Sequence, residues 1–117
     1  MTKTKLSLEG LTFQATKINE AKNVLTITLN RPEKKNALNN VMMNEICYAL
    51  AYAKQERSIR VVVIAAEGDI FCAGADLRRE ESESNVPKLE GSDDISLMLR
   101  HLYLSLIHIS EPTRRNS

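Results

Sequence analysis

Residue types that mark several protein classes are scarce in this 117-residue sequence. It has no tryptophan, 4% aromatic residues and two cysteines, Cys47 and Cys72. So few aromatic rings provide no platform on which nucleic-acid bases could stack. Two cysteines are too few for a disulfide framework, and their spacing is not that of metal ligands. We therefore expect an intracellular protein in a reducing compartment, with no metal site.

Excess charge and long apolar runs are also missing. Sixteen basic and fifteen acidic residues leave a net charge of +1, which gives no electrostatic reason to bind nucleic acid or an anionic membrane. No apolar run reaches the length of a membrane span, and no signal-peptide core follows the first lysines. We expect a cytoplasmic protein with neither partner, or a mitochondrial or peroxisomal one if the source is eukaryotic. The four glycines form no dinucleotide-binding or phosphate-binding pattern.

The first third of the chain predicts two strands. Apolar and polar residues alternate over residues 11–19 and again, more regularly, over residues 24–30. An alternation with period two is typical of strands with one buried face. Residues 20–23 then form the connection of a hairpin, and Arg31-Pro32 ends the second strand because proline cannot continue a ladder.

A helix and a third strand follow. Asn39 or Asn40 is a suitable N-cap, and helix-forming residues continue to about Glu56. One face of this helix carries apolar residues at helical spacing, namely Met43, Ile46, Cys47 and Leu50. The apolar run 61–66 is typical of a parallel strand buried on both faces. The order strand, helix, strand predicts an α/β fold whose ligand site lies in the loops after Asn30 and Ala66.

The rest of the chain holds few candidates for chemistry. Residues 79–94 are polar and acidic and predict a long mobile loop, and a second helix begins at Ile95. His101 on that helix is more typical of a boundary residue than of a catalytic base. Cys72 is more typical of a small packing residue than of a nucleophile, since no histidine lies near it in the sequence.

A backbone site is the remaining candidate, in residues 68–76. The small residues Ala73, Gly74 and Ala75 let a ligand approach the main chain closely. Amide N–H groups there could stabilise a developing oxyanion, which is worth about 3–4 kcal/mol in a transition state. The sequence supports a purely structural alternative equally well, namely a tight turn from strand to helix with Asp76 near the start of the helix.

Three blocks resemble the enoyl-CoA hydratase/isomerase (crotonase) family. The first is residues 25–32 with 36–39, and the second is residues 60–64. The third reads Phe71-Cys72-Ala73-Gly74-Ala75-Asp76-Leu77. The first and third blocks are specific when they occur together, and the resemblance covers residues 11–103.

The resemblance implies an α/β fold, a crotonase-like spiral of ββα turns of which this chain has only the N-terminal portion. It also implies acyl-CoA thioester substrates and no cofactor beyond the CoA that the substrate carries. The residues implied for substrate and CoA binding are Ala37, Leu38, Ala73, Gly74, Ala75 and Asp76. Of these, Ala75 is implied to be catalytic, because its backbone N–H donates to the thioester carbonyl oxygen. The loop 79–94 is implied to border the acyl pocket.

The same resemblance shows what this chain does not contain. The family's second oxyanion donor, its acid/base glutamates and its C-terminal trimerisation helices lie farther along. We expect an enoyl-CoA hydratase that forms a homotrimer or hexamer at full length, and a 117-residue chain that is inactive alone. The alternatives are an isomerase, hydrolase, decarboxylase or dehalogenase of the superfamily, or a non-catalytic module that binds acyl-CoA or RNA.

The final residues resemble a laboratory sequence. Residues 104–114 match, codon for codon, the in-frame translation of the transposon-end adapter used to prepare sequencing libraries. We expect residues 1–10 to be an N-terminal tail, 11–103 an incomplete crotonase-like domain and 104–117 a non-native tail. The alternative is a natural amphipathic segment. Resequencing intact genomic DNA decides between them, because a natural gene that continues through residue 117 with other codons contradicts the adapter origin.

Overall fold

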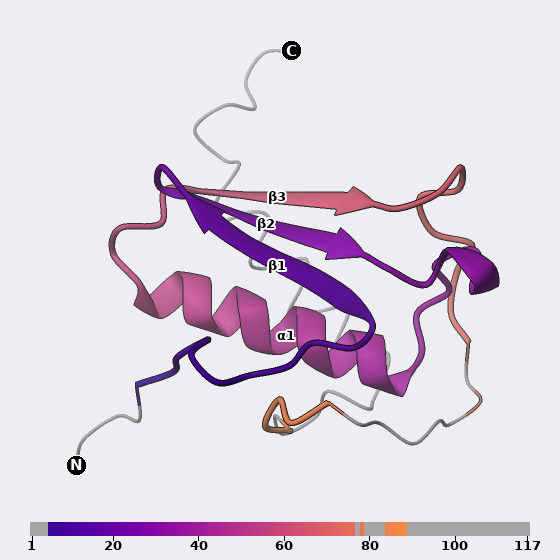
Figure 1. Cartoon of the computed structure of the whole chain (residues 1–117), viewed down its shortest axis with the longest axis horizontal. Helices are drawn as coiled ribbons and strands as arrows, with labels where there is room; N and C mark the ends of the chain where they lie inside the picture. The colour runs from indigo at the N-terminus through magenta and orange to yellow at the C-terminus, as the bar shows by residue number, and fades with distance from the viewer. Residues whose placement is uncertain (1–4, 77, 79–83, 89–117) are drawn as a thin grey trace.

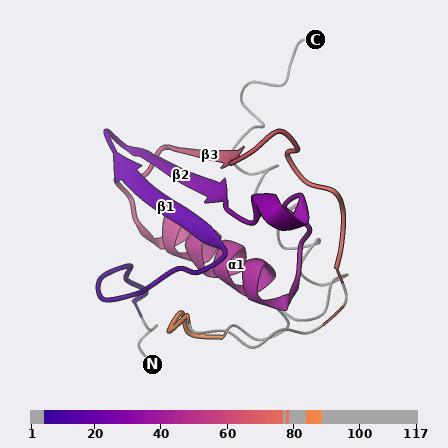
Figure 2. The ribbon, with the colours of Figure 1, turned by 45° about the vertical axis from the view of Figure 1, so that its right-hand side comes forward.

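The computed structural model describes residues 5–76, 78 and 84–88. Within these residues, three strands and two helices follow one another in the order β1 (Thr16–Ala21), β2 (Val24–Leu29), the short 3-10 helix η1 (Pro32–Lys34), α1 (Asn40–Gln55) and β3 (Val61–Ala66). The strands form one sheet in which β2 is central, antiparallel to β1 and parallel to β3. Helix α1 lies across one face of the sheet (Figure 1) (Figure 2). The predicted strand, helix, strand order is confirmed.

The hairpin turn between β1 and β2 is tighter than predicted. Lys22 and Asn23 both have positive φ angles, of 53° and 70°, which is typical of a two-residue hairpin turn. Glu20 and Ala21 belong to β1 and pair with β2. The prediction that residues 20–23 are all connection was therefore wrong, because two left-handed residues are enough to reverse the chain.

The first strand begins later than the predicted range 11–19. A buried carboxylate, that of Glu45 on α1, accounts for this difference. Its Oε2 accepts a hydrogen bond from the Gln14 N–H at 2.8 Å, and its Oε1 accepts one from the Ala15 N–H at 2.9 Å. The Thr16 hydroxyl also donates to Oε1 at 2.9 Å. Because the helix carboxylate satisfies these N–H groups, the chain needs no strand partner until Thr16.

Helix α1 begins as predicted and presents a slightly different face to the sheet. Asn39 is the N-cap, and its side chain accepts from the Met42 N–H at 2.9 Å. The core between helix and sheet contains Leu25, Ile27 and Leu29 from β2 and Val41, Met42, Ile46, Ala49 and Leu50 from α1. Met43 and Cys47 are buried but lie outside this cluster. All four residues of the predicted apolar face are therefore buried, and two of them, Ile46 and Leu50, belong to the core against the sheet.

The third strand has the predicted bounds but not the predicted burial. Val62 and Ile64 pack against the core, whereas Val61 and Val63 are 45% and 42% exposed. The prediction of burial on both faces was wrong. In the part of the chain that the structure describes, α1 covers one face of the sheet, and alternate residues of β3 face away from it.

Several predictions fall on residues that the structure does not describe. They include the helix from Ile95, the boundary role of His101, the segment 104–117 and most of the loop 79–94. Residues 84–88 of that loop are described and form neither helix nor strand. Within the described ranges, no helix is long and apolar enough to cross a membrane.

Candidate functional site

The loops after β2 and β3, in which the sequence places the ligand site, meet at the carboxyl ends of these parallel strands. Figure 1 shows η1 and the chain that leaves β3 at the same end of the sheet. Gly68 marks their contact, because a Cβ atom there would lie 3.0 Å from the Pro32 Cβ. Its φ of +88° also favours glycine. The two loops therefore pack backbone against side chain at this point.

Asn36 holds the two loops together through its side chain. It is fully buried, and its Nδ2 donates to the carbonyl oxygens of Glu67 and Ile70, each at 2.8 Å. Its Oδ1 accepts from the Arg31 N–H at 2.7 Å. The φ of Asn36 is +56°, a left-handed conformation that asparagine tolerates better than most residues. Every polar atom of this side chain is used to fix loop geometry.

A short β-bridge between Leu38 and Ala75 completes the junction. The Leu38 N–H donates to the Gly74 carbonyl at 2.8 Å, and the Asp76 N–H donates to the Leu38 carbonyl at 2.7 Å. In a parallel bridge the residue between these two partners points its own N–H the opposite way. The Ala75 N–H therefore faces away from Leu38, and it donates to no group of the described residues.

The surface around the Ala75 N–H is open. Ala73, Gly74 and Ala75 are all exposed, and Ala37 and Leu38 are half-buried beside them. Gly74 has a φ of +121°, and a Cβ atom there would meet nothing within 4 Å. Ala73 is held to the loop after β2, since its N–H donates to the Lys35 carbonyl at 3.0 Å. The arrangement presents one backbone donor on an accessible, rigidly anchored loop.

A buried guanidinium supports the same loops. The Arg31 side chain is 7% exposed, and its Nη1 donates a short hydrogen bond to the Ala37 carbonyl. Its Nη2 lies 3.9 Å from the Asp76 Oδ2. Arg31 thus links Ala37, which precedes Leu38, to Asp76, which follows Ala75, and places a buried positive charge between the two loops.

Asp76 is held in its ionised form. The Arg78 side chain donates to both carboxylate oxygens at 3.0 Å, and the Arg78 N–H donates to Oδ1 at 3.2 Å. These hydrogen bonds, together with the charges of Arg78 and Arg31, lower the pKa of Asp76 from 3.8 to about 2, against an opposing effect of partial burial. Asp76 therefore anchors the loop as an anion and is unsuited to donate a proton near neutral pH.

The cysteines differ in surroundings. Cys47 is buried on α1, and burial raises the pKa of its thiol to about 11. Cys72 is half-buried and packs against the core, in agreement with the predicted packing role. Among the described residues, no group of three or more His, Cys, Asp or Glu side chains is placed to hold a metal ion.

Comparison with known proteins gives the family. The sequence profile of the Enoyl-CoA hydratase/isomerase family matches residues 19–113. The chain belongs to this family. A probable enoyl-CoA hydratase, echA6 of Mycobacterium leprae, is 40% identical over 73 residues, which are 60% of this chain and 30% of that relative. The mitochondrial Delta(3,5)-Delta(2,4)-dienoyl-CoA isomerase of Pongo abelii is 37% identical over 81 residues, 69% of this chain and 25% of that relative.

Solved structures confirm the fold of this enoyl-CoA hydratase/isomerase family member. The crystal structure of an enoyl-CoA hydratase/isomerase from Mycobacterium paratuberculosis is 36% identical, with a TM-score of 0.55. The match covers 57% of this chain and 26% of that one. The predicted fold class, part of a crotonase-like α/β fold, is confirmed. The chain spans less than a third of the length of the relatives it matches here.

The sequence of this family member predicts the loops of the site but not the side chains that hold them in position. The structure brings Ala37, Leu38 and residues 73–76 together, as the resemblance implies. The sequence predicts that Arg31 ends a strand and that residues 33–36 form an exposed loop, and the resemblance includes Arg31 and Asn36 without giving either a positioning role. The exposed-loop prediction was wrong for Asn36, because its side chain is fully buried between the two loops. A signal for Asn36 was present, since asparagine in a polar loop tolerates the left-handed conformation better than most residues. Arg31 gave no comparable signal.

Proposed function

We propose that the protein carrying this chain binds acyl-CoA thioesters and adds water across the 2,3 double bond of an enoyl-CoA. The observation that carries the proposal is the Ala75 N–H, which points away from its bridge partner Leu38 on an exposed loop. The family membership and the enoyl-CoA hydratase name of a relative support the substrate class.

In this proposal the Ala75 N–H donates to the thioester carbonyl oxygen. The donor is already in place before the reaction, so it stabilises the negative charge that develops on that oxygen without reorganisation. Ala37, Leu38, Ala73 and Gly74 line the CoA side of the site, where small residues permit close approach to the backbone. Asp76 lies at the edge of this surface, where its ionised carboxylate holds the loop in place and does not act as an acid.

The proposed reaction is a general acid/base addition. A carboxylate removes a proton from water as the water oxygen bonds to C3, and the electron pair of the double bond moves toward the thioester. The enolate oxygen forms opposite Ala75, and a carboxylic acid then delivers a proton to C2. We propose that these carboxyl groups and the second donor belong to the full-length protein outside this chain, and that no cofactor or metal takes part.

An isomerase is the second candidate, because a dienoyl-CoA isomerase is among the relatives. It would use the same carbonyl donor and move a proton between carbons of the acyl chain without adding water. The two reactions share the carbonyl donor and differ in whether water is added and in which carboxyl groups face the acyl chain. We propose the hydratase first because the M. leprae relative carries that name.

The assay gives the full-length protein a 2-enoyl-CoA and a 3-enoyl-CoA after dialysis against a chelator. Hydration predicts that mass spectrometry finds a product heavier than the 2-enoyl-CoA by one water. Isomerisation predicts a shifted double bond and no change in mass. No reaction with either substrate contradicts the proposal. The 117-residue chain alone is expected to be inactive, and turnover by it would contradict the assignment of the carboxyl groups to regions outside it.

The setting of the protein is also a proposal. We infer a cytoplasmic homotrimer or hexamer that binds no nucleic acid and no membrane. The mitochondrial relative keeps an organellar location open for a eukaryotic source. Sedimentation equilibrium of the full-length protein measures the mass of the assembly, and a monomer contradicts the inference.

A further inference from the structure

Residues 5–15 precede the range that the family profile matches, which begins at residue 19. The structure nevertheless ties this segment to α1 at positions between Glu45 and Gln55. The Leu6 N–H donates to the Gln55 side chain at 2.8 Å, and the Tyr48 hydroxyl donates to the Ser7 carbonyl at 3.0 Å. Glu45 accepts from the far end of the segment, at Gln14 and Ala15.

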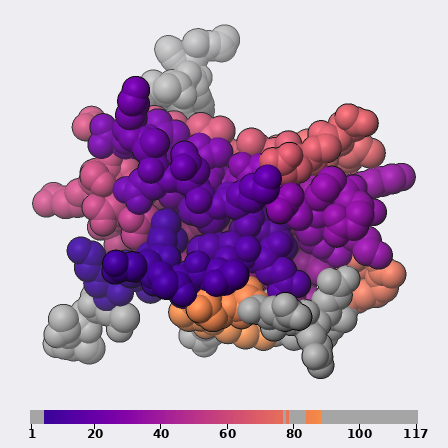
Figure 3. Space-filling view, in the orientation of Figure 1, coloured from indigo at the N-terminus to yellow at the C-terminus, as the bar shows by residue number. Residues whose placement is uncertain are grey.

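These contacts come from one face of the helix. Glu45, Tyr48 and Gln55 are separated by three and seven residues, and side chains at such spacings project from the same side of an α-helix. The segment therefore lies along α1 as a strap, which we define as residues 5–15. Figure 3 shows it on the surface, in indigo, next to residues 84–88 in orange.

Asn85 joins the strap to residues 84–88. Its Oδ1 accepts from the Thr12 N–H at 2.7 Å, and its Nδ2 donates to the Gly10 carbonyl at 2.9 Å. One carboxamide thus pairs with a donor and an acceptor on the same edge of the strap, as a neighbouring peptide group does in a sheet. Gly10 has a φ of +79° in the turn that exposes this edge.

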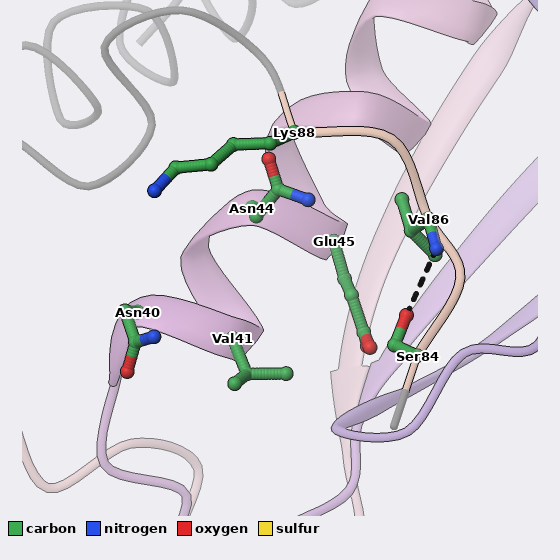
Figure 4. A pocket seen from close by; sticks show the side chains of 7 residues that line it. All are labelled: Asn40, Val41, Asn44, Glu45, Ser84, Val86 and Lys88. Atoms are coloured by element: carbon green, nitrogen blue, oxygen red, sulfur yellow. Dashed lines mark hydrogen bonds between the residues drawn. The ribbon is translucent and has the colours of Figure 1, made fainter. Parts of the chain in front are cut away.

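Residues 84–88 also contact α1 itself. Val86 is buried, and the Asn44 Nδ2 donates to the Pro87 carbonyl at 3.1 Å. A cavity of about 150 Å³ remains between the helix and this segment. Figure 4 shows the residues that line it, namely Asn40, Val41, Asn44, Glu45, Ser84, Val86 and Lys88. The segment therefore contacts the strap through Asn85 and the helix through Val86 and Pro87, with free volume between the segment and the helix.

We propose that Asn85 is a positioning residue through which the strap sets where residues 84–88 lie, and thereby the room at the acyl side of the substrate pocket. The inference rests on the proposed function, because these residues belong to the loop that the resemblance implies beside the acyl chain. It extends the site to residues outside the family profile. The chemistry at the thioester carbonyl is left untouched, since Ala75 and its supports lie on other loops.

The test compares Asn85→Ala and Asn85→Asp with a control, Asn19→Ala at an exposed position of β1, in the full-length protein. Asn85→Ala removes both bonds. Asn85→Asp keeps the acceptor for Thr12 and opposes the Gly10 carbonyl with a second oxygen, so it is also informative if the alanine variant folds poorly. Amide exchange at Thr12 is expected to accelerate about five- to thirtyfold in Asn85→Ala, less in Asn85→Asp and not in the control.

Kinetics separate positioning from a purely structural role. In Asn85→Ala the KM for a long-chain 2-enoyl-CoA is expected to rise about fivefold or more, while kcat with crotonyl-CoA stays within about twofold. Unchanged exchange at Thr12 overturns the strap contact. Faster exchange at Thr12 with an unchanged KM for the long-chain 2-enoyl-CoA overturns the effect of Asn85 on the pocket. If the unmodified protein acts on no enoyl-CoA, the proposed function fails, whereas the exchange result still decides the strap.

Discussion

Leu38 and Ala75 form an isolated parallel β-bridge that joins the loop after β2 to the loop after β3. The bridge fixes the direction of three successive peptide groups on the second loop. Its two hydrogen bonds, of 2.8 and 2.7 Å, use the Gly74 carbonyl and the Asp76 N–H. The Ala75 N–H between them is left facing outward. A pair of ordinary ladder bonds thus produces the one feature on which the proposed chemistry depends.

Asn36 is predicted to be the side chain on which this junction depends most. Asn36→Asp keeps the acceptor for the Arg31 N–H and loses both donors to the carbonyls of Glu67 and Ile70. Each unsatisfied buried group costs about 1–3 kcal/mol, so the free energy of unfolding should fall by at least that amount. Urea denaturation of the full-length protein measures it.

Two further variants separate the contributions of Asn36. Asn36→Gly removes the hydrogen bonds but readily adopts the positive φ, whereas Asn36→Ala adds left-handed strain of about 1 kcal/mol. Asn19→Ala, at an exposed position, is the matched control. An Asn36→Asp protein as stable as the control variant would show that the carboxamide does not hold the loops.

The lowered pKa of Asp76 predicts that the free energy of unfolding depends on pH in acidic solution. Its folded-state pKa of about 2 lies below the ordinary 3.8, chiefly through hydrogen bonds from Arg78. The folded protein therefore binds this proton more weakly than the unfolded chain does. The stabilisation from Asp76 is complete above about pH 4 and is lost as the pH falls through about 2. Asp76→Asn should lose less stability than the unmodified protein between these values.

The carboxyl carbon of Asp76 can be followed directly by NMR as the pH is lowered. The predicted midpoint is about 2. Asp69→Asn, at an exposed position of the same loop, is the control for the stability measurement. A midpoint of Asp76 near 3.8 would contradict the described contacts with Arg78.

We expect alanine substitutions at Gly74 and Gly68 to lower stability by different amounts, although both residues have positive φ angles. An added Cβ at Gly74 meets no atom within 4 Å, whereas one at Gly68 lies 3.0 Å from the Pro32 Cβ. Both alanine variants carry backbone strain of about 1–3 kcal/mol, and Gly68→Ala adds a clash. We expect Gly68→Ala to be the less stable protein in thermal unfolding.

For activity we expect the opposite order, with Gly74→Ala more impaired than Gly68→Ala. The methyl group of Gly74→Ala occupies the open space that the proposed thioester enters, so its kcat/KM with crotonyl-CoA should fall about tenfold or more. The folded fraction of Gly68→Ala should retain more activity than Gly74→Ala. If Gly74→Ala were fully active, the substrate would not approach this part of the loop.

The local features of the fold could be predicted from the sequence, and the long-range ones could not. The bounds of β3 and the Asn39 cap follow from apolar runs and capping chemistry, which depend on neighbouring residues. The start of β1 depends on Glu45, which is distant in the sequence, and no local pattern announces that contact. A charged residue among the apolar positions of a predicted helix was the only available signal.

The candidate site shows the same division. That the two loops would meet follows from parallel strand topology, and the family resemblance selected Ala75. The atoms that hold the loops in place belong to Arg31 and Asn36, whose roles arise only when the strands are side by side. Burial of β3 on its outer face was predicted wrongly for a related reason, because an apolar run does not reveal which part of the chain covers it.

The different burial of the two cysteines predicts that a thiol reagent labels Cys72 before Cys47. Cys47 is buried, with its pKa raised to about 11, so little thiolate is present or accessible near neutral pH. Cys72 is half-buried on the site loop. Iodoacetamide should therefore modify Cys72 first, as peptide mass spectrometry can measure. Both should react in denaturant, and equal rates in the folded protein would contradict the burial of Cys47.

The most direct test of the account concerns the Ala75 N–H. Replacing Ala75 with its α-hydroxy acid turns this peptide bond into an ester and removes the donor. It also weakens the Gly74 carbonyl that accepts from Leu38. The same replacement at Leu38 removes that hydrogen bond and keeps the Ala75 donor, so it is the matched control.

Stopped-flow and steady-state kinetics with crotonyl-CoA then give kcat for both full-length esters. Loss of one oxyanion donor predicts that the Ala75 ester falls about 10²–10³-fold in kcat, with the Leu38 ester much less affected. Equal kcat values for the Ala75 ester, the Leu38 ester and the unmodified protein would contradict the claim that this backbone N–H stabilises the reacting carbonyl.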